Sequence, residues 1–153
     1  MAEVIIAVDG PAGSGKSSVS KAAARELGFG YLDTGAGYRA FAIHKSNFPD
    51  LELAQLIENF DYSISIDPDN ELVMLSGVDV TAEIRTAAVS EAVSFVAKEQ
   101  LVRNLQLQDA RKRITDCQNQ GVIVEGRDIT TVVAPEAILK VLLTASPSVR
   151  LER

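Results

Sequence analysis

Residues 4–17 read VIIAVDGPAGSGKS, and this stretch decides the fold. Residues 4–8 form a short apolar run rich in β-branched side chains, which is typical of a strand buried on both faces of a parallel sheet. Residues 10–17 match the pattern G-x-x-x-x-G-K-[ST]. Residues 16–27 are predicted to form a helix that ends at Gly28. A strand, a glycine-rich loop and a helix in this order predict a phosphate-binding loop in an α/β fold.

The residues of the loop have the chemistry needed to hold a nucleoside triphosphate. Glycines let backbone N–H groups approach phosphate oxygens where a Cβ would collide, and the start of the helix presents its positive dipole end to the anion. Lys16 is expected to reach the β- and γ-phosphates, and the Ser17 hydroxyl to bind Mg²⁺. The predicted ATP-binding residues are consecutive in the chain: Gly10, Pro11, Ala12, Gly13, Ser14, Gly15, Lys16, Ser17 and Ser18. The alternative is a glycine-rich turn that binds nothing.

The rest of the chain predicts a doubly wound parallel sheet with a small antiparallel insert. Residues 62–66 alternate with period two, and residues 68–70 supply turn chemistry. Further short strands are expected at residues 71–75 and 78–80, so the segment 61–80 is predicted to be antiparallel. Thr86 is a good N-cap for a helix to about residue 97, and helix continues to about residue 120. The core elements are expected at these positions: strands at 29–32, 122–124 and 139–144, and a helix at 35–45.

Composition excludes several classes of function. The net charge of −6 and the pI near 4.8 argue against a nucleic-acid partner, which would require a basic face. Cys117 is the single cysteine, so no intramolecular disulfide can form and a reducing compartment is indicated. The sequence shows neither a basic leader nor an apolar run long enough to span a membrane. We therefore expect a cytoplasmic protein with no membrane partner, and a monomer.

The last residues of the sequence predict the start of another helix. Ser146 is an N-cap residue, and Pro147 occupies the first helical position. A parallel βαβ unit needs a further strand after its crossover helix, and the sequence stops at Arg153. The expectation is that these 153 residues are a fragment of a longer chain.

Two arginines follow predicted core strands. Arg39 comes less than two helical turns after one strand, and Arg127 comes directly after another. The carboxyl ends of parallel strands meet at the edge of the sheet where ligands bind in this architecture. Arginine is suited to bidentate phosphate contacts, so both are candidate phosphate ligands. The alternative for each is a solvated surface arginine.

Several long stretches resemble the bacterial cytidylate kinases, a family of the nucleoside monophosphate kinase group. They are IIAVDGPAGSGKSSVSKAAARELGFGYLDTGAGYRA from residue 5, DVTAEIRTAAVSEAVSFVA from residue 79, the EGRDI segment from residue 125 and LKVLLTAS from residue 139. The resemblance implies a P-loop kinase core at residues 1–60 and 121–153 and an NMP-binding insert with helices at 61–120. It also implies that the C-terminal lid and the last core strand are missing, which would make this chain a truncated, weakly active form.

The resemblance implies transfer of the γ-phosphoryl group of ATP, with Mg²⁺, to CMP or dCMP in pyrimidine metabolism. Arg39 and Arg127 would bind the α-phosphate of the acceptor and, with Lys16, act in catalysis. Cytosine carries an exocyclic amine that a carboxylate accepts. The implied set around the acceptor is Thr34, Arg39, Ser94, Arg103, Arg127 and Asp128, of which Ser94, Arg103 and Asp128 would read the base.

Each of these assignments has a structural alternative. Asp128 could form an ion pair with Arg127, Ser94 could be a polar residue on a helix face, and Arg103 could be a surface charge. Asp33 could reach Mg²⁺ through a water molecule or cap the following helix.

Three residues depart from the family pattern. Ser18 replaces a common threonine, and Thr130 stands where glycine is usual, which would be costly if that position had positive φ. Gln100 stands where proline is frequent. Ser94 and Arg103 would face opposite sides of one continuous helix, so a break between them is required for both to reach one base.

Two other functions stay open at this point. One is a different small-molecule P-loop kinase of the shikimate or gluconate type, and the other is a nucleotide-binding switch module. His44 is expected to lie at the surface or to pack, and Cys117 to face the core. The sequence contains no cluster of His and Cys with the spacing of a metal site.

Overall fold

The computed structural model describes residues 2–11 and 13–144, which form two compact units. Within the described residues, unit 1 comprises residues 2–11, 13–34, 66–69 and 109–144. Unit 2 comprises residues 35–65 and 70–108. The helix predicted from Ser146 lies outside the described residues.

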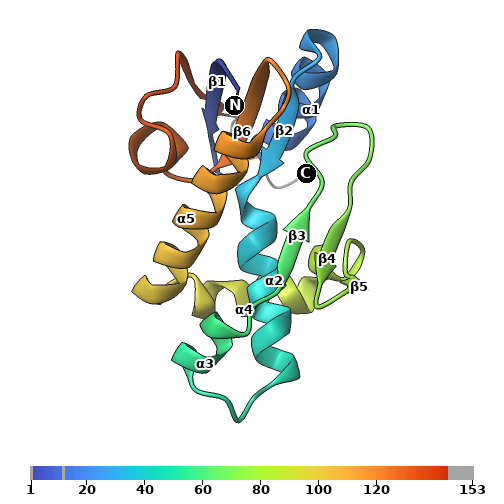
Figure 1. The fold of residues 1–153 in the computed structure, drawn as a ribbon, viewed down its shortest axis with the longest axis vertical. Coiled ribbons are helices and arrows are strands. Elements are labelled where there is room, and N and C mark those ends of the chain that lie inside the picture. The colour runs from blue at the N-terminus through green and yellow to red at the C-terminus, as the bar shows by residue number, and fades with distance from the viewer. Residues whose placement is uncertain (1, 12, 145–153) are drawn as a thin grey trace. The chain divides into compact units, whose positions relative to one another are not determined.

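Unit 1 is built on a parallel sheet with the strand order β2-β6-β1-β7. Figure 1 shows β6 between β2 and β1. The strands are β1 (Val4–Asp9), β2 (Gly30–Asp33), β6 (Gly121–Gly126) and β7 (Leu139–Leu142). Every residue of β6 is buried, because β6 lies between β2 and β1. The expected fold class is confirmed, and the second strand is shifted by one residue from the predicted 29–32.

Helix α1 (Lys16–Leu27) covers the sheet of unit 1, with the predicted bounds. Gly28 ends it with φ 68°, and the Gly28 N–H bonds the last turn, as expected for a glycine C-cap. Ala24 of α1 packs with Val8, Tyr31 and Ile123, one residue from each of three strands. This packing holds α1, which directly follows the phosphate loop, against the sheet.

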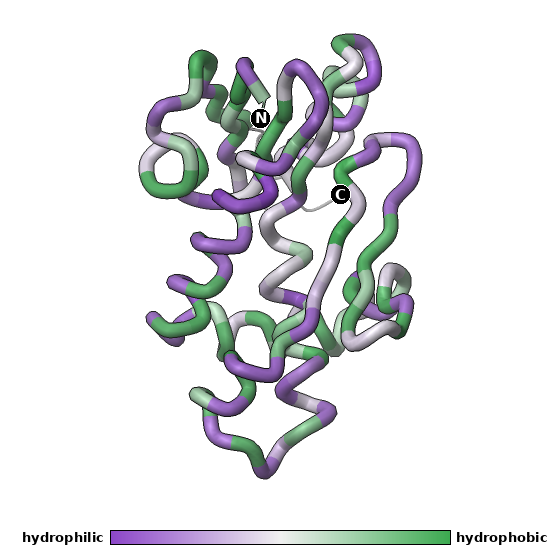
Figure 2. The backbone as a smooth tube through the Cα atoms, viewed as in Figure 1, coloured by the Kyte–Doolittle hydropathy of each residue, from purple (hydrophilic) through white to green (hydrophobic). Residues whose placement is uncertain are grey.

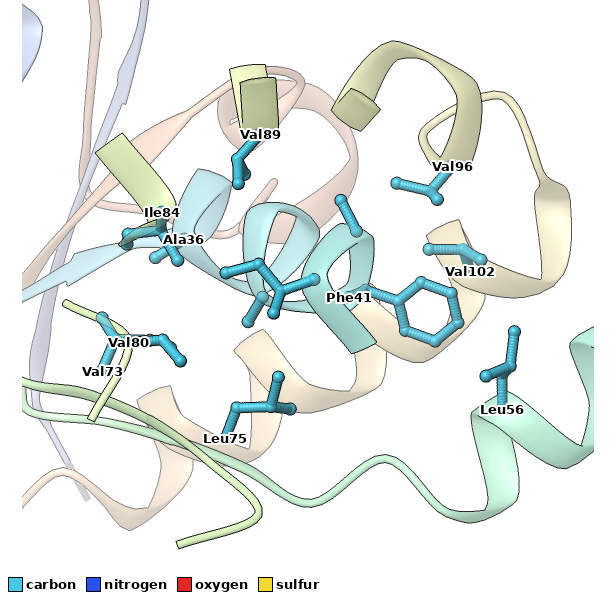
Figure 3. Packing of buried hydrophobic residues seen from close by; sticks show 13 residues of the cluster. Ala36, Phe41, Leu56, Val73, Leu75, Val80, Ile84, Val89, Val96 and Val102 are labelled. Carbon is cyan, nitrogen blue, oxygen red and sulfur yellow. The ribbon is translucent and has the colours of Figure 1, made fainter. Parts of the chain in front are cut away.

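Unit 2 contains the second helix and the antiparallel insert. Its elements begin with α2 (Thr34–Asn47), whose first residue belongs to unit 1, and α3 (Leu53–Glu58), which the sequence reading does not predict. The insert is the antiparallel sheet β3-β4-β5: β3 (Tyr62–Ile64), β4 (Val73–Leu75) and β5 (Val78–Asp79). Phe41 of α2 lies in the core near Leu56, Val96 and Val102 (Figure 3).

The break required between Ser94 and Arg103 is present without a proline. Helix α4 (Ala87–Val96) is capped by Thr86, whose side chain accepts from the Val89 N–H, and α5 (Gln100–Asp116) follows after residues 97–99. Backbone groups at the junction form hydrogen bonds with one another: the Glu99 N–H donates to the Val96 carbonyl oxygen, and the Glu99 carbonyl oxygen accepts from the Arg103 N–H. Along α5, hydrophobic residues are interspersed among more numerous hydrophilic ones (Figure 2). The helix ends at Asp116, before the predicted residue 120.

The two residues expected to pack are both buried. His44 is 1% exposed, its Nε2 lies 3.0 Å from the Leu56 carbonyl oxygen, and its ring touches Phe41, Phe48 and Phe60. Cys117 is 2% exposed. Among the described residues, none of the helices combines the length and the apolar character needed to cross a membrane.

Candidate active site

The phosphate loop joins β1 to α1, as the motif predicts. Gly13 and Gly15 have φ of 77° and 84°, left-handed values that favour glycine. A Cβ on Gly10 would lie 2.6 Å from the Leu143 carbonyl oxygen and 2.7 Å from Ser14 Oγ. Three glycines of the motif are therefore required by the backbone itself. Ala12 lies outside the described residues.

The polar groups of the loop suit a polyphosphate. Ser14 Oγ is buried and has no hydrogen-bond partner among the described residues. Gly15, the N-cap of α1, offers no side chain to the first N–H groups of that helix. Lys16 Nζ makes only a 3.5 Å contact with the Pro11 carbonyl oxygen in the described part of the chain, and Ser18 is exposed on the first turn. These donors fit the predicted anion.

Glu125 contacts the loop from strand β6. The Ser17 hydroxyl donates to Glu125 Oε1 at 2.6 Å, and the Tyr31 hydroxyl donates to the same oxygen at 2.6 Å. Asp33 of β2 is paired with Glu125 in the sheet register and is also buried. The sequence reading missed Glu125 and Tyr31. The available signal was a single acidic residue in the otherwise apolar run of residues 121–126.

Burial sets the electrostatics of this group. The pKa of Glu125 is raised, chiefly because burial penalises the carboxylate and also because of the negative charge of Asp33. The hydrogen bonds from Ser17 and Tyr31 and the charge of Lys16 act in the opposite direction. The pKa of Tyr31 is raised as well, first by burial and then by the charges of Asp33 and Glu125. A cation near Ser17 would relieve this crowding of negative charge.

The pH dependence of folding should report on Glu125. An acid with a raised folded-state pKa binds its proton more tightly when folded, so its stabilising effect is present below its ordinary pKa of 4.5 and is lost as pH rises through the raised value. Glu125→Gln removes this loss. In urea unfolding with EDTA at several pH values from 4 upward, the wild type should lose stability relative to Glu125→Gln as pH rises. A pH-independent difference between the two proteins would contradict the assignment.

Asp33 was predicted to approach Mg²⁺ through water. It is 6% exposed and lies at the carboxyl end of β2, beside Glu125. Among the described residues, no group of three or more His, Cys, Asp or Glu side chains is arranged to hold a metal directly. A cation bound by Ser17 and by phosphate oxygens needs no such cluster, and this role of Asp33 stays a prediction.

Three predicted acceptor residues lie in unit 1, at or near the end of β6. Thr34 donates its hydroxyl to the Glu125 carbonyl oxygen at 3.0 Å. Arg127 and Asp128 follow β6 and are exposed, and neither side chain forms an ion pair with a described residue. The structure thus offers no support for the alternative in which Asp128 only pairs with Arg127.

Thr130 does not have the positive φ that would make it costly. The left-handed residue of this turn is Asp128, with φ 56°, and Thr130 lies in the π-helical turn Ile129–Val133 that follows. The Thr130 hydroxyl donates to Asp9 Oδ2 at 2.5 Å, and its backbone N–H donates to the same oxygen at 3.1 Å. Thr130 is therefore an integral part of the turn that carries Asp128.

The remaining predicted acceptor residues lie in unit 2. Arg39 is on α2, Ser94 on α4 and Arg103 on α5, so the last two belong to separate helices. Ser94 and Arg103 are exposed, and the Ser94 hydroxyl donates to the Glu91 carbonyl oxygen at 2.9 Å within its own helix. Their roles toward an acceptor stay predictions.

Comparison with known proteins identifies relatives along the whole chain. A family model described as cytidylate kinase matches residues 6–153. The cytidylate kinase of Mycobacterium leprae is 43% identical over 155 residues, which cover 100% of this chain and 68% of that protein. That of Rhodococcus opacus is 46% identical over 156 residues, covering 98% and 67%. The chain thus spans about two thirds of the length of these relatives.

A solved structure shares the fold. The crystal structure of TT1252 from Thermus thermophilus superposes with a TM-score of 0.50 at 19% identity, covering 99% of this chain and 71% of that one. At this identity the likeness extends to the fold alone.

Proposed function

The chain belongs to the cytidylate kinase family, and from this premise we propose that it transfers the γ-phosphoryl group of ATP to CMP or dCMP, giving ADP and CDP or dCDP. The observation that carries the proposal is the phosphate loop, whose buried Ser14 hydroxyl has no hydrogen-bond partner among the described residues and whose Ser17 hydroxyl donates to the acidic residue Glu125. Shikimate-type kinases would share the loop but have no use for a cytosine-reading Asp128.

The donor side of the reaction follows from the residues of unit 1. The loop N–H groups and Lys16 would hold the phosphates, and the Ser17 oxygen would bind Mg²⁺. The Ser17 hydroxyl already donates its hydrogen to Glu125, so the lone pairs of its oxygen are left to face a cation. Glu125 and Asp33 would bind waters of that ion. Bound Mg²⁺ supplies charge neutralisation on the phosphate oxygens.

The acceptor side needs positioning more than proton transfer. The phosphate of CMP is ionised at neutral pH, so its oxygen can attack without a strong general base. In our proposal Arg39 and Arg127 bind this phosphate, while Asp128, Ser94 and Arg103 read the cytosine and Thr34 lies beside the nucleotide. The exposed and unpaired state of Asp128 within the described chain supports its part in this set. Catalysis is then orientation and charge neutralisation by Lys16 and the arginines.

The proposal extends to the setting of the enzyme. It places the enzyme in the cytoplasm, in pyrimidine nucleotide metabolism, as a monomer with ATP and CMP or dCMP as its ligands. The net charge of −6 is consistent with the absence of a nucleic-acid or anionic membrane partner.

The choice of acceptor tests the proposal. In a coupled assay of ADP release with each monophosphate in turn, CMP and dCMP should exceed UMP and AMP in kcat/KM by about 100-fold or more, because uracil leaves a base-reading carboxylate unpaired. Shikimate and gluconate serve as controls for the other kinase class. Equal use of UMP, or preference for a sugar acid, would refute the proposal.

A kinase and a nucleotide-binding switch module should respond differently to the loss of Arg39. A kinase should lose acceptor turnover when Arg39 is replaced by alanine, while slow ATP hydrolysis with water remains. A nucleotide switch should show little change, and its nucleotide exchange should depend on a partner protein. The Arg39→Ala variant therefore separates the two classes in the same assay.

A further inference from the structure

The turn that carries Asp128 is held by a side chain from another strand. Asp128 has the left-handed angles φ 56° and ψ 27°, which few residues other than glycine adopt without support. Asp9, the last residue of β1, accepts from the Ile129 N–H at 2.7 Å and from the Thr130 N–H at 3.1 Å. These are the first N–H groups of the turn Ile129–Val133.

Asp9 thereby accepts the hydrogen bonds that an N-cap side chain would normally accept. Asp128 occupies the N-cap position, where an aspartate usually accepts from the following N–H groups with its own side chain. Here the Asp128 side chain makes no such bond, and it contacts no other donor in the described chain. Because Asp9 satisfies the N–H groups, the Asp128 carboxylate remains exposed and available to a ligand.

The Thr130 hydroxyl strengthens this arrangement. It donates to Asp9 Oδ2 at 2.5 Å, so the carboxylate receives three hydrogen bonds from two consecutive residues. Hydrogen bonds to a charged acceptor are stronger than neutral ones. At the other end of the turn, Arg111 donates to the Val132 carbonyl oxygen at 2.8 Å. An anion at the start and a cation at the end both complement the dipole of the turn.

We propose that Thr130 and Asp9 are positioning residues for base recognition, because their three hydrogen bonds fix the left-handed turn that presents Asp128 to the acceptor base. The inference rests on the proposed function, since it requires Asp128 to read cytosine. Asp9 also directly precedes Gly10 of the phosphate loop, so one carboxylate connects the donor loop to the base-reading turn within unit 1.

Thr130→Val tests the hydroxyl while leaving the backbone N–H groups and the side-chain volume in place. We expect the KM and the equilibrium dissociation constant for CMP to rise about five- to tenfold, which is less than the full effect of losing one hydrogen bond to a charged group, because the lost bond acts on CMP only through Asp128. The ratio of kcat/KM for CMP over UMP should fall by a similar factor. The KM for ATP should stay within about twofold of the wild-type value.

Two variants serve as matched controls. Thr130→Ser keeps the hydroxyl and should restore CMP affinity and base preference. Thr115→Val removes an exposed hydroxyl that donates to the Arg111 carbonyl oxygen in α5, and it should change neither constant. Asp9→Asn should weaken CMP binding more than Thr130→Val. The double variant should lose less CMP affinity than the product of the two single fold-changes, because both substitutions disrupt the same contact.

The outcomes separate this inference from the proposed function. A wild-type protein without preference for CMP would remove the proposed function and this inference with it. A wild type that prefers CMP, combined with a Thr130→Val variant of unchanged CMP affinity and base preference, would overturn the inference alone. An equal loss for ATP and CMP accompanied by lower stability would also overturn it, since that pattern indicates general structural support.

Discussion

Replacing Lys16 by methionine should lower kcat/KM about 10²- to 10³-fold, the usual effect of losing one group that stabilises transition-state charge. Methionine keeps most of the apolar stem and removes the ammonium that would neutralise the transferring phosphoryl group. Among the described residues, Lys16 Nζ makes only a 3.5 Å contact with the Pro11 carbonyl oxygen, so the free energy of unfolding should hardly change. The assay is ADP release with ATP and CMP, together with titration of a fluorescent ATP analogue.

A lysine outside the site provides the control for this prediction. Lys112 forms an exposed ion pair with Asp116 within α5, and Lys112→Met should leave both the rate and the affinity for ATP unchanged. If Lys16→Met kept full activity, the phosphate loop would not serve phosphoryl transfer, and the kinase proposal would fail at its donor side.

Gly126→Ala should reduce the free energy of unfolding by about 2–4 kcal/mol, the sum of backbone strain and overpacking. Gly126 ends β6 with φ 156°, and a Cβ there would overlap Thr34 Oγ1 and lie 3.2 Å from Ile129 Cδ1. To make room, Thr34 would have to give up its bond to the Glu125 carbonyl oxygen. Urea unfolding followed by circular dichroism measures the loss.

Gly28→Ala is the matched control for Gly126→Ala. Gly28 has φ 68°, and a Cβ there would meet no heavy atom within 4 Å, so only backbone strain of about 1 kcal/mol applies. Adding Thr34→Ala to Gly126→Ala should recover part of the loss because it removes the overlapping oxygen. Equal losses in the Gly28 and Gly126 variants would show that the close approach of Thr34 carries no cost.

The sequence predicted those parts of the molecule that depend on neighbouring residues. The bounds of α1 follow from the loop before Lys16 and from the glycine after Leu27, and both signals are local. The antiparallel insert follows from alternation and turn residues over a short stretch. Each of these features is encoded within about 20 residues, a range over which periodicity and capping decide the structure.

The contacts that complete the site were not predictable in this way. Ser17 and Glu125 are 108 positions apart, and Asp9 and Thr130 are 121 apart, so no pattern along the chain connects them. The break before α5 also lacks a sequence signal, since no proline stands where one was expected. Backbone hydrogen bonds stabilise the junction between the two helices. Arg39 was a candidate because it follows a predicted core strand, whereas Ser94 and Arg103 came from family resemblance alone. The assignment of all three to the acceptor awaits the experiments above.

The order of the strands has a consequence for how the chain folds. Val4 pairs with Gly121, more than a hundred residues later, and β1 forms its other pairing with β7, later still. Bringing such distant segments together has a high entropic cost, and folds dominated by non-local pairing form slowly. The core of unit 2, in contrast, draws on one stretch of about 70 residues and can assemble first. Strand β1 is thus among the last elements of unit 1 to complete its pairings, and until then its apolar residues stay exposed and prone to aggregation.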